Sequence, residues 1–126
     1  MSTSALHEVA RHHPAVRVLV LLGSRARDDA HERSDWDVGV LADDGLDLAP
    51  LHSDVVLALQ TEDVDVVDLA AASAVLRRDA ASDGQLVFER EAGLFVDFQV
   101  EAAIFWCDIE PVVREALAAV LAAAHR

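Results

Sequence analysis

The segment that decides the fold is Leu21–Leu41, LLGSRARDDAHERSDWDVGVL. It starts inside one apolar run, VRVLVLL (Val16–Leu22), and ends in another, DVGVL (Asp37–Leu41). Short Val-rich runs bounded by turn residues are typical of strands that are buried on both faces. We therefore predict two buried strands, with the chain turning at the Gly-Ser pair and forming a short helix over residues 25–30.

The rest of the chain alternates between helical and extended patterns. The spacing of apolar residues predicts helices over residues 4–12, 47–60 and 71–81, and a Val-rich strand over 63–69. The segment 85–90 fits either a short strand or the exit of the preceding helix. The last third predicts two helices with apolar stripes, the second beginning near Pro111, and part of one stripe could cover a partner.

Length and composition predict one domain over residues 1–126 with a real core, since 53% of the residues are apolar. No window approaches the roughly 18 apolar residues that cross a membrane. The polar N-terminus is unlike a signal peptide. A single cysteine, Cys107, excludes an internal disulfide framework and fits a reducing compartment, so we expect a cytoplasmic protein.

The charge of the chain restricts its partners. The formal net charge is −13, all ten basic residues are arginine, and the chain contains no tyrosine. Such acidity argues against general binding of nucleic acid, whose phosphates need neutralising. A nucleotide would also be repelled at long range, so a nucleotide site here requires local arginines and metal cations.

Paired carboxylates are the main chemical feature of the sequence. Asp35 and Asp37 lie at i and i+2 at the start of a strand, so they face the same side. Two carboxylates ~4 Å apart repel by about 4 kcal/mol at an effective dielectric constant of 20, unless water or a cation separates them. Asp63 and Asp65 share a face of the third strand, and one of them can complete a three-carboxylate site suited to Mg²⁺.

The Gly-Ser pair supplies a complementary feature. Gly23 lets a phosphate approach the backbone closely, and the Ser24 hydroxyl can donate to a phosphate oxygen. Arg25 and Arg27 follow directly, and one of them can reach a triphosphate. A phosphate cradle beside a carboxylate cluster that binds two metals indicates phosphoryl or nucleotidyl transfer.

Together these residues carry a family resemblance. GSRARDDAHERSDWD (residues 23–37) satisfies the Gly-Ser-x10-Asp-x-Asp motif of the nucleotidyltransferase superfamily that resembles DNA polymerase beta. VDVVDL (64–69) and GQLVFEREAGLFVDFQVEAAIFWCD (84–108) are similar to minimal nucleotidyltransferases, the antitoxin partners of HEPN ribonuclease toxins. The resemblance implies an α/β fold: a small mixed sheet flanked by helices, an acidic site at one sheet edge and a helical C-terminus.

The resemblance also implies roles for individual residues. Asp35 and Asp37 would bind the Mg²⁺ ions, and Asp65 would be the third carboxylate, a metal ligand that helps to activate the acceptor hydroxyl. Gly23, Ser24 and Arg25 would hold the phosphates of ATP. The implied reaction moves AMP from ATP to a tyrosine hydroxyl on the HEPN toxin, within a homo- or hetero-oligomer.

One departure and two other functions stand beside this interpretation. Many relatives carry Gly where this chain has Asp28, which adds negative charge near the phosphates. A binding module could instead neutralise the toxin by covering it. A small-molecule nucleotidyltransferase generally needs additional chain for an acceptor pocket, and a polymerase is disfavoured by charge and size.

Trp36, between the two aspartates, is expected to point away from them and pack.

Overall fold

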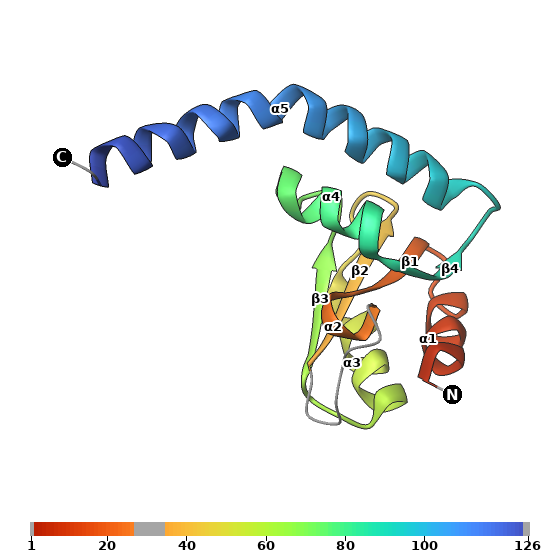
Figure 1. The fold of residues 1–126 in the computed structure, drawn as a ribbon. Helices are drawn as coiled ribbons and strands as arrows, with labels where there is room; N and C mark the ends of the chain where they lie inside the picture. The colour runs from red at the N-terminus through yellow and green to blue at the C-terminus, as the bar shows by residue number, and fades with distance from the viewer. Residues whose placement is uncertain (1, 27–34, 125–126) are drawn as a thin grey trace.

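The computed structural model describes residues 2–26 and 35–124, and shows a four-stranded sheet between two layers of helices (Figure 1). In chain order the elements are α1 (Ser2–Arg11), β1 (Val16–Leu22), α2 (Gly23–Ala26), β2 (Trp36–Ala42), α3 (Leu48–Leu59), β3 (Val64–Asp68), α4 (Ala74–Asp83), β4 (Gln85–Glu89) and α5 (Leu94–Ala124). None of the helices in the described residues has the length and apolarity needed to cross a bilayer.

The sheet is mixed, as predicted, with the strand order β3-β2-β1-β4. The central strand β1 runs antiparallel to both β2 and β4, whereas β2 and β3 are parallel. Apart from half-buried Arg17, every residue of β1 is buried, which explains its nearly continuous apolar sequence.

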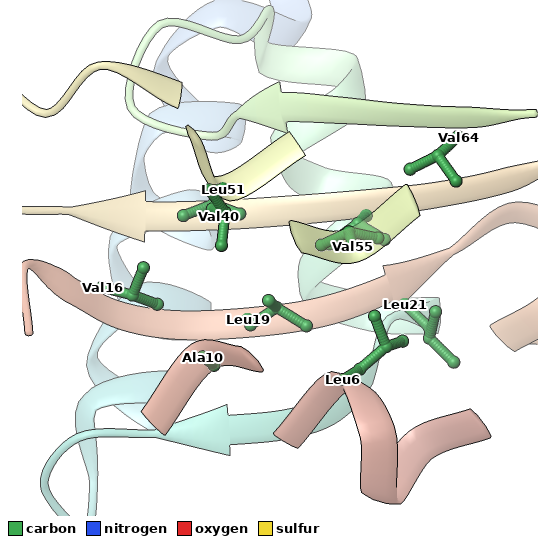
Figure 2. Packing of buried hydrophobic residues seen from close by; sticks show 10 residues of the cluster. Leu6, Ala10, Val16, Leu19, Leu21, Val40, Leu51, Val55 and Val64 are labelled. Atoms are coloured by element: carbon green, nitrogen blue, oxygen red, sulfur yellow. The ribbon is translucent and has the colours of Figure 1, made fainter. Parts of the chain in front are cut away.

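A hydrophobic cluster lies on each face of the sheet. On one face, helices α1 and α3 pack Leu6, Leu51 and Val55 against Leu19 of β1 and Val40 of β2 (Figure 2). On the other face, α4 and α5 pack Ala80, Phe95, Phe98 and Ala102 against β1 residues Val18 and Val20. Successive β1 side chains therefore serve different layers, because strand side chains alternate between faces.

Most predicted elements are confirmed, with their ends shifted by a few residues. The first strand spans Val16–Leu22 as predicted, and the ambiguous segment at 85–90 is the strand β4. The helix predicted over 71–81 begins later, at Ala74, where the Ser73 side chain accepts from the Leu76 N–H. Of the short helix predicted over 25–30, residues 27–30 lie outside the described part of the chain.

The prediction of two C-terminal helices is wrong. Residues 94–124 form one helix, α5, with Pro111 inside it, and Figure 1 shows it as a single curved helix. Pro111 has no N–H to donate to the carbonyl of Cys107, four residues earlier. Beyond the two valines that follow Pro111, residues 114–124 are almost all Ala, Leu, Arg or Glu, which favour a helix, so α5 continues past this missing bond.

Candidate functional site

The close approach of two residues marks one end of the sheet. The chain passes directly from β1 into α2 at Gly23, whose φ is +64°. A Cβ atom at this position would lie 2.9 Å from Oδ2 of Asp37 on the neighbouring strand β2. Glycine is therefore required here both by the left-handed backbone and by the carboxylate beside it.

Asp37 and Asp65 lie side by side on parallel strands. They are Cα partners in the β2–β3 register, which places two carboxylates on one face of the sheet. Asp65 belongs to the edge strand β3, and Asp37 belongs to its inner neighbour β2. The predicted acidic site thus lies at the edge of the sheet and extends one strand inward.

The surroundings of Asp37 disfavour its negative charge. Burial raises the pKa of Asp37 above its ordinary value, and the charges of Asp65 and Asp35 raise it further. Asp35 is exposed and lies just before β2, two residues from Asp37. Among the side chains that the structure describes, no arginine forms an ion pair with these three aspartates.

Asp63, the rival of Asp65, is also close to the site. It lies just before β3, and its backbone carbonyl accepts a 2.9 Å hydrogen bond from the Trp36 N–H, which ties the starts of β2 and β3 together. A shallow hollow of about 210 Å³ is lined by Asp35, Glu62, Asp63, Val64 and Asp65. The choice of Asp65 as the third carboxylate therefore stays a prediction.

The expected orientation of Trp36 is confirmed. Its side chain is half-buried and packs against the cluster under α1 and α3, on the opposite face of the sheet from Asp37. Asp68, at the end of β3, does not join the acidic site. Its Oδ1 accepts from the Ala70 N–H at 3.0 Å and caps the following turn.

The predicted phosphate-binding residues are placed only in part. Gly23, Ser24 and Arg25 belong to α2, directly after β1, but the side chains of Ser24 and Arg25 lie outside the described part of the structure. Arg27 and Asp28 fall entirely outside the described residues. The roles of these four side chains therefore stay predictions.

A cleft beside Asp37 was not predicted from the sequence. It has a volume of about 400 Å³ and lies between the end of the sheet and α4, lined by Leu22, Gly23, Asp37, Val67, Leu76, Asp79, Ala80, Asp83 and Gly84. The available signal was the pair Asp79 and Asp83, which are four residues apart and so share a face of α4. The cleft gives a substrate access to Asp37 and Gly23 together.

The donor chemistry of the site suits magnesium. Carboxylate oxygens are hard ligands, and Mg²⁺ is usually bound by one or two protein carboxylates together with substrate phosphates and water. Asp37 and Asp65 provide such a pair, and a divalent cation would offset both the burial and the repulsion between carboxylates that raise the Asp37 pKa. Within residues 2–26 and 35–124, no three His, Cys, Asp or Glu side chains are already gathered around one metal position.

Comparison with known proteins agrees with this geometry. The family model described as "Polymerase beta, Nucleotidyltransferase" matches residues 4–92, which run from within α1 to just past β4 and therefore include all the aspartates of the acidic site. The chain belongs to this nucleotidyltransferase family. The four-stranded mixed sheet and its flanking helices are thus a polymerase beta-like nucleotidyltransferase fold, as the resemblance implied.

Two curated relatives of this nucleotidyltransferase are named protein adenylyltransferases, and a similar solved structure is a toxin-antitoxin. Protein adenylyltransferase MntA of Aphanizomenon flos-aquae is 27% identical over 116 residues, covering 82% of this chain and 77% of the relative. The Shewanella oneidensis protein of the same name is 37% identical over 75 residues, covering 57% of this chain and 53% of the relative. A crystal structure of a toxin-antitoxin with AMP-PNP superposes with a TM-score of 0.84 at 26% identity, covering 96% of this chain and 99% of that one.

Proposed function

We propose that this nucleotidyltransferase acts in the cytosol as an antitoxin, transferring AMP from ATP to a tyrosine hydroxyl of a HEPN-type ribonuclease toxin. The observation that carries the proposal is the register of Asp37 and Asp65 beside Gly23, which combines a carboxylate pair with a close approach to the backbone. Support comes from relatives named protein adenylyltransferase and from the similar toxin-antitoxin structure with AMP-PNP.

We assign the residues the roles that the family resemblance implies. Gly23 admits the phosphates close to the backbone, and Ser24 and Arg25 bind them with a hydroxyl and a guanidinium. Asp35 and Asp37 hold Mg²⁺ beside the phosphates, with Asp65 on the neighbouring strand as a further ligand. The metal, when bound, would withdraw charge from the phosphate oxygens and help the pyrophosphate to leave.

Asp65 lies on the side from which the acceptor arrives. Since β3 is the edge strand, a partner can approach Asp65 without displacing another strand. The Asp65 carboxylate orients the tyrosine hydroxyl and accepts its proton as the oxygen–phosphorus bond forms and the bond from the α-phosphorus to pyrophosphate breaks. In-line attack requires the hydroxyl to be held about 3–3.5 Å from that phosphorus.

The acceptor must belong to another protein, because this chain contains no tyrosine. The test is to incubate the chain with ATP, Mg²⁺ and the HEPN-type protein encoded beside it, and then to measure intact masses. We expect the partner to gain one or more AMP units with the wild-type chain and none with Asp35→Asn/Asp37→Asn. Asp44→Asn, an exposed aspartate outside the site, is the matched control and should transfer normally.

A binding module would give a different result. If the Asp35→Asn/Asp37→Asn chain neutralised the toxin fully, and the wild-type pair gained no mass, the chain would act by covering its partner. The enzymatic proposal would then be wrong.

A further inference from the structure

The last part of α5 is exposed to solvent over its whole circumference. We call residues 111–124, PVVREALAAVLAAA, the arm. Every side chain in it is exposed except Val113, which is half-buried, and Figure 1 shows the arm extending past α4 and beyond the sheet. The arm therefore contributes little to the core, and its sequence needs another explanation.

The arm is apolar although it is exposed. Arg114 and Glu115 are its only charged residues, and Leu117, Val120 and Leu121 are 58%, 64% and 59% exposed. High helix propensity explains the alanines of the arm. It does not explain why large apolar side chains are exposed to water there. Exposed apolar surface of this kind marks a contact with another molecule.

One face of the arm continues the stripe by which α5 packs on its own domain. The stripe begins with buried Phe98 and Ala102 and half-buried Phe105, spaced four and three residues apart. The same helical spacing continues through Ile109, Val113, Leu117 and Val120. We call these last four residues the inner stripe, since they extend the domain-facing side of α5 into the arm.

The part of α5 just before the arm packs against α4. There, Phe105 and Trp106 lie under the guanidinium groups of Arg77 and Arg78 from α4, 4.8 and 4.3 Å from the ring centres. The Gln99 side chain donates a 2.9 Å hydrogen bond to the Ala81 carbonyl. Because α4 also lines the cleft with Asp37, the arm continues from the part of α5 that packs on one wall of the cleft.

We propose that the inner stripe is the docking surface for the acceptor protein, which lays an apolar helix face with basic flanks against it. This inference rests on the proposed function, because the occupant is the protein that receives AMP. A partner held along the arm lies beside α4, and from there it can present a hydroxyl to the cleft. This domain is too small to enclose a side chain of another protein. Docking along the arm would instead position the acceptor hydroxyl for attack.

Charge distinguishes this occupant from a second copy of the chain. Helix α5 carries five acidic residues and one arginine, and that arginine, Arg114, is already paired with Glu110. Four of these acidic residues precede the arm, and two copies of the chain, each with a net charge of −13, would repel each other as whole molecules, whereas a basic partner would be attracted.

The test compares two faces of the arm with equal added charge. Leu117→Glu/Val120→Glu alters the inner stripe, and Ala118→Glu/Ala122→Glu alters the opposite side of the same segment. All four positions are exposed, so both variants should fold like the wild type by circular dichroism and bind ATP with Mg²⁺ equally by calorimetry. Binding of the HEPN-type protein is measured by interferometry, and AMP transfer by intact mass.

The expected result is a loss of partner affinity of at least about 100-fold for the inner-stripe variant, since truncating or charging central apolar contacts typically has such effects. The opposite-face variant should bind within about threefold of the wild type. Equal binding by all three chains, or equal loss in both variants, would overturn the proposal.

Two further outcomes are separable. If the partner binds through the inner stripe but gains no AMP, the docking surface stands and the proposed enzymatic function fails. If the wild-type chain alone is a dimer that the inner-stripe variant converts to a monomer with unchanged partner binding, the occupant is a second copy and the proposal is wrong.

Discussion

Gly23 and the Asp37 carboxylate compete for the same space, so a single methyl group tests the site. Gly23→Ala should cost about 1 kcal/mol in folding free energy through its φ of +64° and should push Asp37 out of position. We expect Mg²⁺-dependent ATP affinity, measured by calorimetry, to fall at least about tenfold, because small displacements at a reacting centre have large effects.

Gly45→Ala is the matched control for this substitution. Its φ is also positive, at +84°, but a Cβ there meets nothing within 4 Å. It should lose a similar folding free energy in chemical denaturation and keep ATP affinity. Equal ATP affinity in the two variants would show that the contact with Asp37 does not organise the site.

The raised pKa of Asp37 predicts how the metal-free fold depends on pH. The folded chain holds the Asp37 proton to a higher pH than the unfolded chain, so folding stability falls as pH rises from the ordinary value near 3.8 through the raised pKa. At pH 7 with a chelator, Asp37→Asn should therefore unfold at a temperature equal to or higher than the wild type.

With magnesium, the wild type should unfold at a higher temperature than Asp37→Asn. Bound Mg²⁺ stabilises only a folded chain that can hold it, so Mg²⁺ should raise the unfolding temperature of the wild type and of Asp44→Asn but leave Asp37→Asn unchanged. The measurement is thermal unfolding with and without chelator. A variant that unfolds below the wild type in chelator would contradict the destabilising role of the Asp37 charge.

Asp63 and Asp65 differ in backbone position more than in chemistry. Only Asp65 is in register with Asp37, whereas Asp63 precedes the strand and contributes its carbonyl to Trp36. Asp65→Asn should abolish AMP transfer in the intact-mass assay, and Asp63→Asn should leave substantial transfer. Both variants should keep the wild-type circular dichroism spectrum. The reverse pattern of activities would place the third ligand two residues earlier.

At the scale of elements, local patterns predicted the strands well and one helix boundary badly. The apolar run of β1 is recognisable because this central strand is buried on both faces, so nearly all its side chains are apolar. Pro111 was misread because proline is favoured at the first turn of a helix, and only the surrounding structure shows whether a helix already exists before it. Here Phe98, Ala102 and Phe105 anchor α5 to the domain before Pro111 is reached.

The position of Pro111 predicts a locally weakened arm. Proline inside a helix costs about 3 kcal/mol relative to alanine, so Pro111→Ala should increase helical content and slow hydrogen exchange in residues 112–124. Exchange followed by mass spectrometry would measure both regions of α5 separately. Protection in residues 94–106, which are held by the core, should change little.

Pro50→Ala supplies the control for the Pro111 substitution. Pro50 lies in the first turn of α3, where the N–H has no partner within the helix, so its replacement should not change protection in either segment. Unchanged exchange in Pro111→Ala would show that Pro111 does not limit the stability of the arm.

At the scale of the whole molecule, the candidate site is assembled from distant segments, and this limits what the sequence can reveal. The spacing between Gly23, Asp35 and Asp37 is local, so the sequence alone predicted these residues as a motif. The cleft was not, because α4 reaches Gly23 and Asp37 only through the order in which strands and helices pack. The apolar stripe of α5 was visible, but its division into a buried half and an exposed arm depends on the size of the sheet that it covers.

The net charge of −13 predicts how the whole molecule meets its partner. Long-range attraction to a basic protein accelerates encounter, and salt screens it, since the Debye length falls from about 10 Å at 0.1 M to about 3 Å at 1 M ionic strength. The association rate with the HEPN-type protein should therefore fall at least about tenfold between low and high salt, while the dissociation rate changes little. Stopped-flow fluorescence can follow both, using tryptophan emission. Leu117→Glu/Val120→Glu should dissociate faster than the wild type, because it loses short-range apolar contacts. Its association rate should depend on salt as that of the wild type does, because the chain stays strongly acidic. An association rate that is independent of salt would mean that the acidity of this chain does not guide it to its partner.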